Sequence, residues 1–143
     1  MKQKILIILC CIYSIVGYSQ VNVPMYSANT YLNDIYTIDT TNWVVKTSNT
    51  LTSSTGIVDG VNGAAVQPSS GIIYINYKVL STRYLGILDT ATNFITEVGP
   101  FGDNVASITF GSAYDELYAV TGNGAIESET LYSVNINTGT MTF

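Results

Sequence analysis

The sequence has 143 residues, with five cationic and ten acidic side chains, two cysteines and no histidine. Because the sequence has no histidine, this part of the chain contains no His-based catalytic triad, no Cys-His pair and no His-ligated zinc site. The scarcity of Lys and Arg also argues against binding to nucleic acid or anionic membranes, because neutralising phosphate groups requires many cations.

The N-terminal residues have the pattern of a secretory signal peptide. Residues 1–4 carry two lysines, residues 5–16 form a short apolar run, and Gly17-Tyr18-Ser19 places small residues at the third and first positions before a cut. We therefore predict cleavage between Ser19 and Gln20. The mature chain is then exported, and is secreted, periplasmic or held at the cell surface.

A membrane anchor and a lipoprotein are the alternatives to a signal peptide. The apolar run is shorter than the roughly 20 residues that span a bilayer, and Cys10 and Cys11 lie in its middle rather than at its end. Both cysteines leave with the signal, so we expect a mature chain without disulfides or thiolate metal sites. Loss of Lys2 and Lys4 leaves three cations against ten carboxylates, a net charge of 3 − 10 = −7.

The mature chain is predicted to be a series of short strands. Val, Ile, Tyr and Leu alternate with Thr in short runs, which is typical of half-buried strands, and Ser, Gly, Asn, Asp and Pro fill the segments between them. Residues 48–63 extend one strand and then cross to the next group. The expected strands are 23–27, 34–39, 43–47, 63–67, 72–77, 84–89, 94–99, 106–110, 117–121, 130–135 and one beginning at Thr140.

A pattern of two hairpins repeats along the chain. Residues 64–75 align with residues 108–119 at an offset of 44, and residues 88–96 align with residues 134–142 at an offset of 46. A third copy of the second hairpin lies at residues 35–45, at an offset of 50 from the middle copy, and its turn is predicted to be one residue shorter.

The turn of this second hairpin has a recurring chemistry. In the two later copies a strand ends on Asp89 or Asn135, and the reversal closes on Asn93 or Gly139. Asn and Gly tolerate the left-handed backbone that a tight turn needs. We therefore expect left-handed residues at both positions.

The repeat length favours a β-propeller, whose four-stranded blades recur every 40 to 50 residues or so. A β-sandwich is the alternative, because sandwiches also space their strands at about 8 to 12 residues, although they seldom repeat two hairpins in phase. We expect an all-β fold with about two and a half to three antiparallel blades, at residues 20–52, 60–99 and 104–143.

The ends of the repeat predict a fragment of a longer protein. The first blade part provides only a second, third and fourth strand, and the last strand stops at Phe143 before it reaches the length of its counterpart. We expect the full-length propeller to close with a strand resembling 106–110 beside 23–27, because ring closure removes free sheet edges. The isolated piece is expected to aggregate.

Loops at one end of a propeller usually form its ligand face. The corresponding loops here are residues 48–62, 78–83, 99–104 and 122–129. Their most site-like members combine charge, an aromatic ring and an amide, and are Arg83, Phe101, Asp103 and Asn104. Turn and packing roles are the alternative for each of them.

Other candidate chemistry is weaker. The adjacent carboxylates of Asp115-Glu116 fall in a turn, where such residues are ordinarily solvated. Loop 122–129 has two carboxylates and an amide but lacks the alternating ligands of a calcium loop. Trp43 and several tyrosines suggest sugar stacking, although Tyr36, Tyr74, Tyr118 and Tyr132 occupy repeat positions and are expected to pack within blades. We predict no catalytic residue and no metal ligand.

Segments 131–139 and 88–93 resemble the blades of bacterial exported propellers, including uncharacterised and quinoprotein-like families. Both place Asp or Asn after a strand, followed by Thr-Gly or Thr-Asn. Gln20 after the cut resembles exported proteins of the Bacteroidetes group. Quinoprotein-like blades place Trp after this turn, where Phe94 and Thr140-Met141 stand here, so we expect no quinone and no other cofactor.

The resemblance implies an exported repeat module that binds or interacts with other molecules, since propellers host many unrelated activities. The expected partners are a protein or glycan ligand and the remaining blades of the same full-length chain. The alternative is a hydrolase or lyase whose catalytic residues lie mostly in further blades.

Overall fold

The computed structural model describes residues 25–111 and 115–143, which form strands and loops without any helix. The signal peptide, its cleavage site at Ser19 and Gln20, and the start of the first expected strand lie outside the described residues. Within the described part there is accordingly no helix of the length and apolar character needed to cross a membrane.

Twelve strands are assigned among the described residues, and the all-β expectation is confirmed. They are β1 (Met25–Ala28), β2 (Asp34–Asp39), β3 (Val44–Thr50), β4 (Thr52–Ser53), β5 (Gly60–Val66), β6 (Ile73–Val79), β7 (Thr82–Asp89), β8 (Phe94–Pro100), β9 (Val105–Phe110), β10 (Leu117–Thr121), β11 (Leu131–Val134) and β12 (Met141–Thr142).

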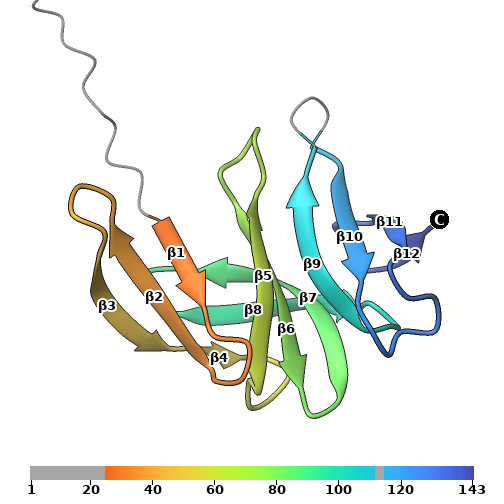
Figure 1. Ribbon diagram of the computed structural model, residues 1–143, viewed down its shortest axis with the longest axis horizontal. Coiled ribbons are helices and arrows are strands. Elements are labelled where there is room, and N and C mark those ends of the chain that lie inside the picture. Colours follow the sequence, from red (N-terminus) through yellow and green to blue (C-terminus); the bar gives the residue numbers. More distant parts are fainter. Residues whose placement is uncertain (1–24, 112–114) are drawn as a thin grey trace, which may run out of the picture.

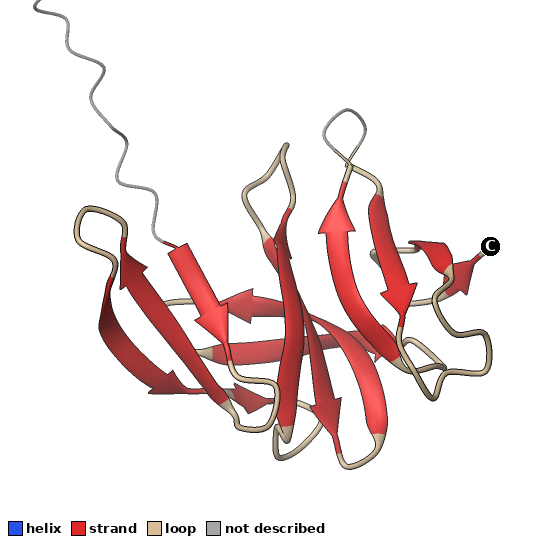
Figure 2. Cartoon of the chain, in the orientation of Figure 1, coloured by secondary structure: helices blue, strands red, loops and turns tan. Residues whose placement is uncertain are grey.

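The strands form three sheets that follow one another along the chain (Figures 1 and 2). Sheet A has the order β1-β2-β3, sheet B the order β4-β8-β7-β6-β5, and sheet C the order β12-β11-β10-β9. All neighbouring strands are antiparallel except β4 and β8. None of the three sheets is closed on itself.

Sheet B is the middle layer, and strand β6 explains why. Successive side chains of a strand point to opposite faces. Tyr74 joins a core cluster shared with sheet C, whereas Ile75 and Tyr77 join a second cluster shared with sheet A. A strand buried on both faces requires a continuous apolar run rather than an alternating one, and the sequence has this run at residues 72–75.

Two core clusters hold the sheets together. The cluster between sheets B and C consists of Ala65, Tyr74, Leu85, Phe101, Val105, Ile108, Leu117, Ala119 and Val134. The cluster between sheets A and B consists of Ile35, Leu51, Val58, Val61, Ile75, Tyr77, Leu88 and Ile95. The same sheet thus packs on two neighbours through two separate cores.

The strand positions expected from the sequence are confirmed to within a few residues, with two corrections in the crossover. Sheet B has five strands rather than four, because Thr52 and Ser53 pair in parallel with Phe94 and Ile95. Strand β5 begins at Gly60, inside the segment expected to be a connection. Both differences arise from long-range pairing, which leaves no local signal in a Ser- and Thr-rich segment.

A repeated turn joins the last two strands of each sheet. Side-chain oxygens of Asp39, Asp89 and Asn135 each accept a hydrogen bond from the backbone N–H two residues later, at 2.8, 2.9 and 2.9 Å. The fifth residue of each turn is left-handed, with φ of 60° at Trp43, 58° at Asn93 and 75° at Gly139. The left-handed residues expected at Asn93 and Gly139 are confirmed.

The shorter first turn expected from the sequence is wrong. Asp39 pairs with Val44 just as Asp89 pairs with Phe94, so four residues lie between the paired positions in both hairpins. Trp43 occupies the left-handed position of this turn, which bulky residues seldom adopt, so its residue type gives no sign that it belongs to the turn.

Aligned on this turn, the three sheets share a common plan. Strands β2, β7 and β11 precede the turn, and β3, β8 and β12 follow it. Strands β1, β6 and β10 pair on the other side of β2, β7 and β11. Sheets B and C continue with β5 and β9, for which sheet A has no counterpart among the described strands.

Replacing Trp43 with Asn should stabilise the protein by about 0.5 to 1 kcal/mol, because a left-handed backbone costs an ordinary L residue roughly this much or more. Trp43 is 70% exposed, so little packing is lost. Urea unfolding measures the change. Trp43→Ala is the control, since it removes the same ring but keeps the strain, and an equal gain in both variants would contradict the explanation.

Stability should fall in acid through Asp39 and Asp89. Hydrogen bonds from the side chains of Thr41 and Thr92, followed by backbone N–H donors, lower the pKa of these two carboxyls. A lowered pKa in the folded state gives stability that is present above the unfolded pKa, near 3.9, and lost as the pH falls through the folded pKa.

The third turn supplies the test, because Asn135 makes the same turn without a titrating group. Urea unfolding of the Asp39→Asn, Asp89→Asn double variant should show a smaller loss of stability between pH 6 and pH 3 than the wild type. An unchanged pH dependence would show that these turns do not contribute to it.

Candidate functional site

The loops expected to share one face lie at one end of the sheets. Figure 1 shows the β6–β7 turn and the β8–β9 and β10–β11 loops along the lower side of the view. Such loops are positioned by the strands that they connect and are free to carry polar side chains. The expected site residues Arg83, Phe101, Asp103 and Asn104 all come from this end.

Asn104 joins these loops. Its side-chain amide donates to the carbonyl of Asn123 at 2.9 Å, and its own carbonyl accepts from the N–H of Gly122 at 2.9 Å. Nε of Arg83 reaches its side-chain oxygen in a long contact of 3.4 Å. Asn104 therefore links β7 to the loop between β10 and β11, and we call Arg83, Asp103, Asn104 and Asn123 the Arg83 cluster.

Asp103 fixes the backbone of the same loop. Its carboxylate accepts from the N–H of Ile126, at 3.0 and 3.2 Å to the two oxygens, and from the N–H of Asn104 at 2.7 Å. Hydrogen bonds from backbone N–H groups to a carboxylate are among the stronger ones in proteins. The carboxylate of Asp103 thus holds the shape of the cluster.

Phe101 does not offer its ring to a ligand. Only 4% of the residue is exposed, and it packs in the core between sheets B and C. Its N–H donates to the carbonyl of Arg83 at 3.0 Å. Phe101 therefore has the packing role that the sequence left open as the alternative. It also contacts the cluster through its hydrogen bond to Arg83.

Arg83 carries the cationic charge of the cluster. Burial lowers the pKa of its guanidinium, because a low-dielectric surrounding disfavours the charged form. Its Nη1 atom is buried and makes no hydrogen bond. A buried donor without a partner costs about 1 to 3 kcal/mol, so the guanidinium retains an unmet preference for an acceptor.

Asp115 and Glu116 have structural partners. Asp115 is left-handed, with φ of 52°, and its carboxylate accepts from the N–H of Ser69 at 3.0 Å. Glu116 accepts from the hydroxyl of Tyr118, and this hydrogen bond raises the pKa of the tyrosine. These hydrogen bonds connect Asp115 to sheet B and Glu116 to β10.

Loop 122–129 exposes Glu127 and Glu129 to solvent. Across residues 25–111 and 115–143, no three Asp, Glu, His or Cys side chains come together in a way that could hold a metal ion. The tyrosines at repeat positions differ in burial, with Tyr74 only 4% exposed and Tyr36, Tyr118 and Tyr132 partly buried.

Two asparagines, Asn62 and Asn76, were not among the residues expected from the sequence to be functional. Asn76 is fully buried, and its amide donates to the carbonyl of Val105 at 2.9 Å, across the junction of sheets B and C. Asn62 is the extra residue of a β-bulge in β5, between the pairs Val61–Tyr77 and Gly63–Asn76. The side-chain oxygens of both asparagines are buried without a hydrogen-bond partner. The one sequence feature that could have identified these two positions is an asparagine within an otherwise apolar strand.

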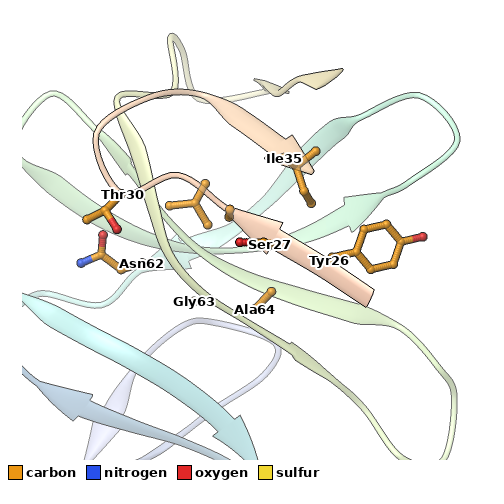
Figure 3. A pocket seen from close by; sticks show the side chains of 9 residues that line it. Tyr26, Ser27, Thr30, Ile35, Asn62, Gly63 and Ala64 are labelled. Atoms are coloured by element: carbon orange, nitrogen blue, oxygen red, sulfur yellow. The ribbon is translucent and has the colours of Figure 1, made fainter. Parts of the chain in front are cut away.

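Asn62 borders a cavity of about 250 Å³ between β1 and β5. Figure 3 shows Thr30 and Asn62 at one end of it, Tyr26 at the other, and Ser27 and Ala64 between them. The cavity lies away from the Arg83 cluster and shares no residue with it. A second hollow, of about 320 Å³, lies over β6, β7 and β8 near Ile72 and Thr96.

Comparison of the sequence with protein-family models finds no matching family, and comparison with curated proteins finds no significant relative.

Proposed function

We propose that the chain is part of an exported β-propeller repeat protein that serves as a binding module. The observation that carries this proposal is the recurrence of one turn, with its Asx hydrogen bond and left-handed fifth residue, in three successive antiparallel sheets. The turns begin at Asp39, Asp89 and Asn135, a spacing typical of propeller blades.

The packing of the sheets favours a propeller over a sandwich. A sandwich has two sheets around a single core, whereas sheet B packs on sheet A and on sheet C through two separate clusters. Gly63 of β5 also lies against β9, where a Cβ would come within 3.3 Å of the backbone nitrogen of Ile108. Adjacent inner strands of successive sheets are a feature of blades set around an axis.

The Arg83 cluster is the proposed ligand-binding face. A guanidinium and two amides suit carbonyl, carboxylate and hydroxyl groups, which glycans and proteins both present. Backbone hydrogen bonds to Asp103 and Asn104 hold the loops in place before a ligand arrives, and such preorganisation reduces the entropy lost on binding.

A glycan panel tests the proposal. The purified protein is applied to immobilised neutral and uronate-bearing oligosaccharides, and we expect saturable binding to at least one of them that Arg83→Gln weakens at least tenfold. Lys46→Ala removes an exposed cation on β3 and should leave binding unchanged. Thermal unfolding confirms that each variant is folded. Binding that Arg83→Gln leaves intact would place the ligand elsewhere.

A further inference from the structure

The chain contains two Asn-Gly pairs, Asn62-Gly63 and Asn123-Gly124. In such a pair the side-chain amide of the asparagine reacts readily with the backbone, because glycine has no Cβ to hinder the approach of its own nitrogen. The reaction requires the Cγ atom of the asparagine to meet the nitrogen of the glycine. It therefore depends on how firmly the surrounding structure holds the peptide bond between the two residues.

Asn123-Gly124 lies in the loop between β10 and β11, on the lower side of Figure 1, and both residues are exposed. Gly124 has φ of 86°, and a Cβ there would meet no atom closer than 3.9 Å. Among the described residues, neither the N–H of Gly124 nor the side-chain amide of Asn123 has a hydrogen-bond partner.

Two hydrogen bonds hold the turn around this pair. The N–H of Ala125 donates to the carbonyl of Gly122 at 3.2 Å, and the side-chain amide of Asn104 donates to the carbonyl of Asn123 at 2.9 Å. Loop segments with few contacts open locally at a small cost in free energy. Opening of this turn allows the nitrogen of Gly124 to reach the side chain of Asn123.

Asn62-Gly63 is the matched pair in which the structure opposes the reaction. Asn62 is the extra residue of the β-bulge in β5, and its side-chain oxygen is buried. Gly63 pairs with Asn76 of β6, and a Cβ at Gly63 would lie 3.3 Å from the backbone nitrogen of Ile108 in β9. The peptide bond of this pair cannot turn without separating β5 from its neighbours.

From this contrast we infer that Asn123 is a site of spontaneous deamidation and that Asn62 is not. The nitrogen of Gly124 loses its proton and bonds to Cγ of Asn123, and the bond from Cγ to the side-chain nitrogen breaks, so that ammonia leaves. Solvent water then opens the succinimide ring. Opening at the side-chain carbonyl gives aspartate, whereas opening at the main-chain carbonyl gives isoaspartate.

The product changes the charge of the Arg83 cluster. In the isoaspartate, the main-chain carbonyl of residue 123 becomes a free carboxylate, and this is the group that accepts from Asn104 at 2.9 Å. Carboxyl groups titrate near about 4, so either product is ionised at neutral pH. The formal charge of the cluster falls from 1 − 1 = 0, for Arg83 and Asp103, to 1 − 2 = −1. The modification is independent of the ligand proposed for this face.

Peptide mapping by mass spectrometry tests the inference on the purified protein incubated at pH 8 and 37 °C. The peptide with residue 123 should gain the mass of an NH₂-to-OH exchange at least tenfold faster than the peptide with residue 62. An isoaspartate-specific methyltransferase should label only the first peptide. In concentrated urea the two pairs should react at similar rates, which is the control for protection by the fold. Equal rates in the folded protein, or an intact Asn123 when the urea sample has reacted, would overturn the inference.

Gly124→Ala tests the chemistry at the site. The added methyl group hinders the attacking nitrogen, so deamidation of Asn123 should slow at least tenfold. Gly71→Ala is the matched control, because Gly71 is also left-handed, with φ of 73° and open space at its Cβ position, and this variant should react like the wild type. Deamidation of Gly124→Ala at the wild-type rate would contradict attack by the nitrogen of residue 124 and overturn the inference.

Discussion

Gly99→Ala should lower the free energy of unfolding by about 3 kcal/mol. A Cβ at Gly99 would lie 2.1 Å from the carbonyl oxygen of Thr138, far inside the van der Waals distance. The carbonyl of Thr138 and the Cα of residue 99 are both fixed by the backbone. The clash can therefore be relieved only if the turn of sheet C moves away from β8. That movement would open the junction that Phe101 helps to fill, and overpacking of a core typically costs 1 to 3 kcal/mol or more.

Urea unfolding of Gly99→Ala and Gly71→Ala makes the comparison. Gly71 has φ of 73° with open space around its Cβ position, so Gly71→Ala should cost only the roughly 1 kcal/mol of a left-handed alanine. If Gly99→Ala costs no more than this control, the close approach of the turn to β8 is not maintained in solution.

Asn76→Asp should destabilise the protein by at least about 3 kcal/mol at neutral pH. The amide of Asn76 donates to the carbonyl of Val105 from a fully buried position, and a carboxylate oxygen there would face that carbonyl without a proton to share. Removing one partner of a buried hydrogen bond and burying a charge are both costly.

The loss should shrink in acid. Burial raises the pKa of an aspartate at this position, so its protonated form is favoured in the folded state. Stability is then fully present below the unfolded pKa, near 3.9, and lost as the pH rises through the folded pKa. Asn42→Asp is the control, because its exposed side-chain oxygen accepts from the N–H of Val44 and an aspartate can do the same. Equal stability of the two variants would contradict this role of Asn76.

The all-β class and most strand positions followed from the sequence, because strands with alternating or continuous apolar residues carry their own signal. Residues 72–75 predicted a strand, and β6 is buried on both faces as that run requires. The left-handed residues were also predictable at Asn93 and Gly139, where the residue type matches the backbone. Trp43 was not, since its type argues against the conformation that its turn imposes.

The candidate site was predictable only in part. Polar residues at expected loop positions identified Arg83, Asp103 and Asn104, although Arg83 lies in β7 rather than in a loop, and hydrogen bonds do connect Asn104 to both of the others. Phe101 could not be assigned to the core, because a loop aromatic has the same sequence signature whether it faces solvent or a neighbouring sheet. The cavity beside Asn62 depends on the spacing of two sheets, which no local pattern encodes.

The parallel pair formed by β4 and β8 has a consequence for the order of folding. Thr52 pairs with Phe94, so β4, which directly follows the strands of sheet A in the chain, completes its hydrogen bonds only on a strand that is synthesised later. The N–H of Thr52 also donates to the carbonyl of Asn93, inside the turn that precedes β8. Strand β4 is therefore fixed only after the hairpin of β7 and β8 has formed, and amide hydrogens of β4 should gain protection from exchange later than those of β7.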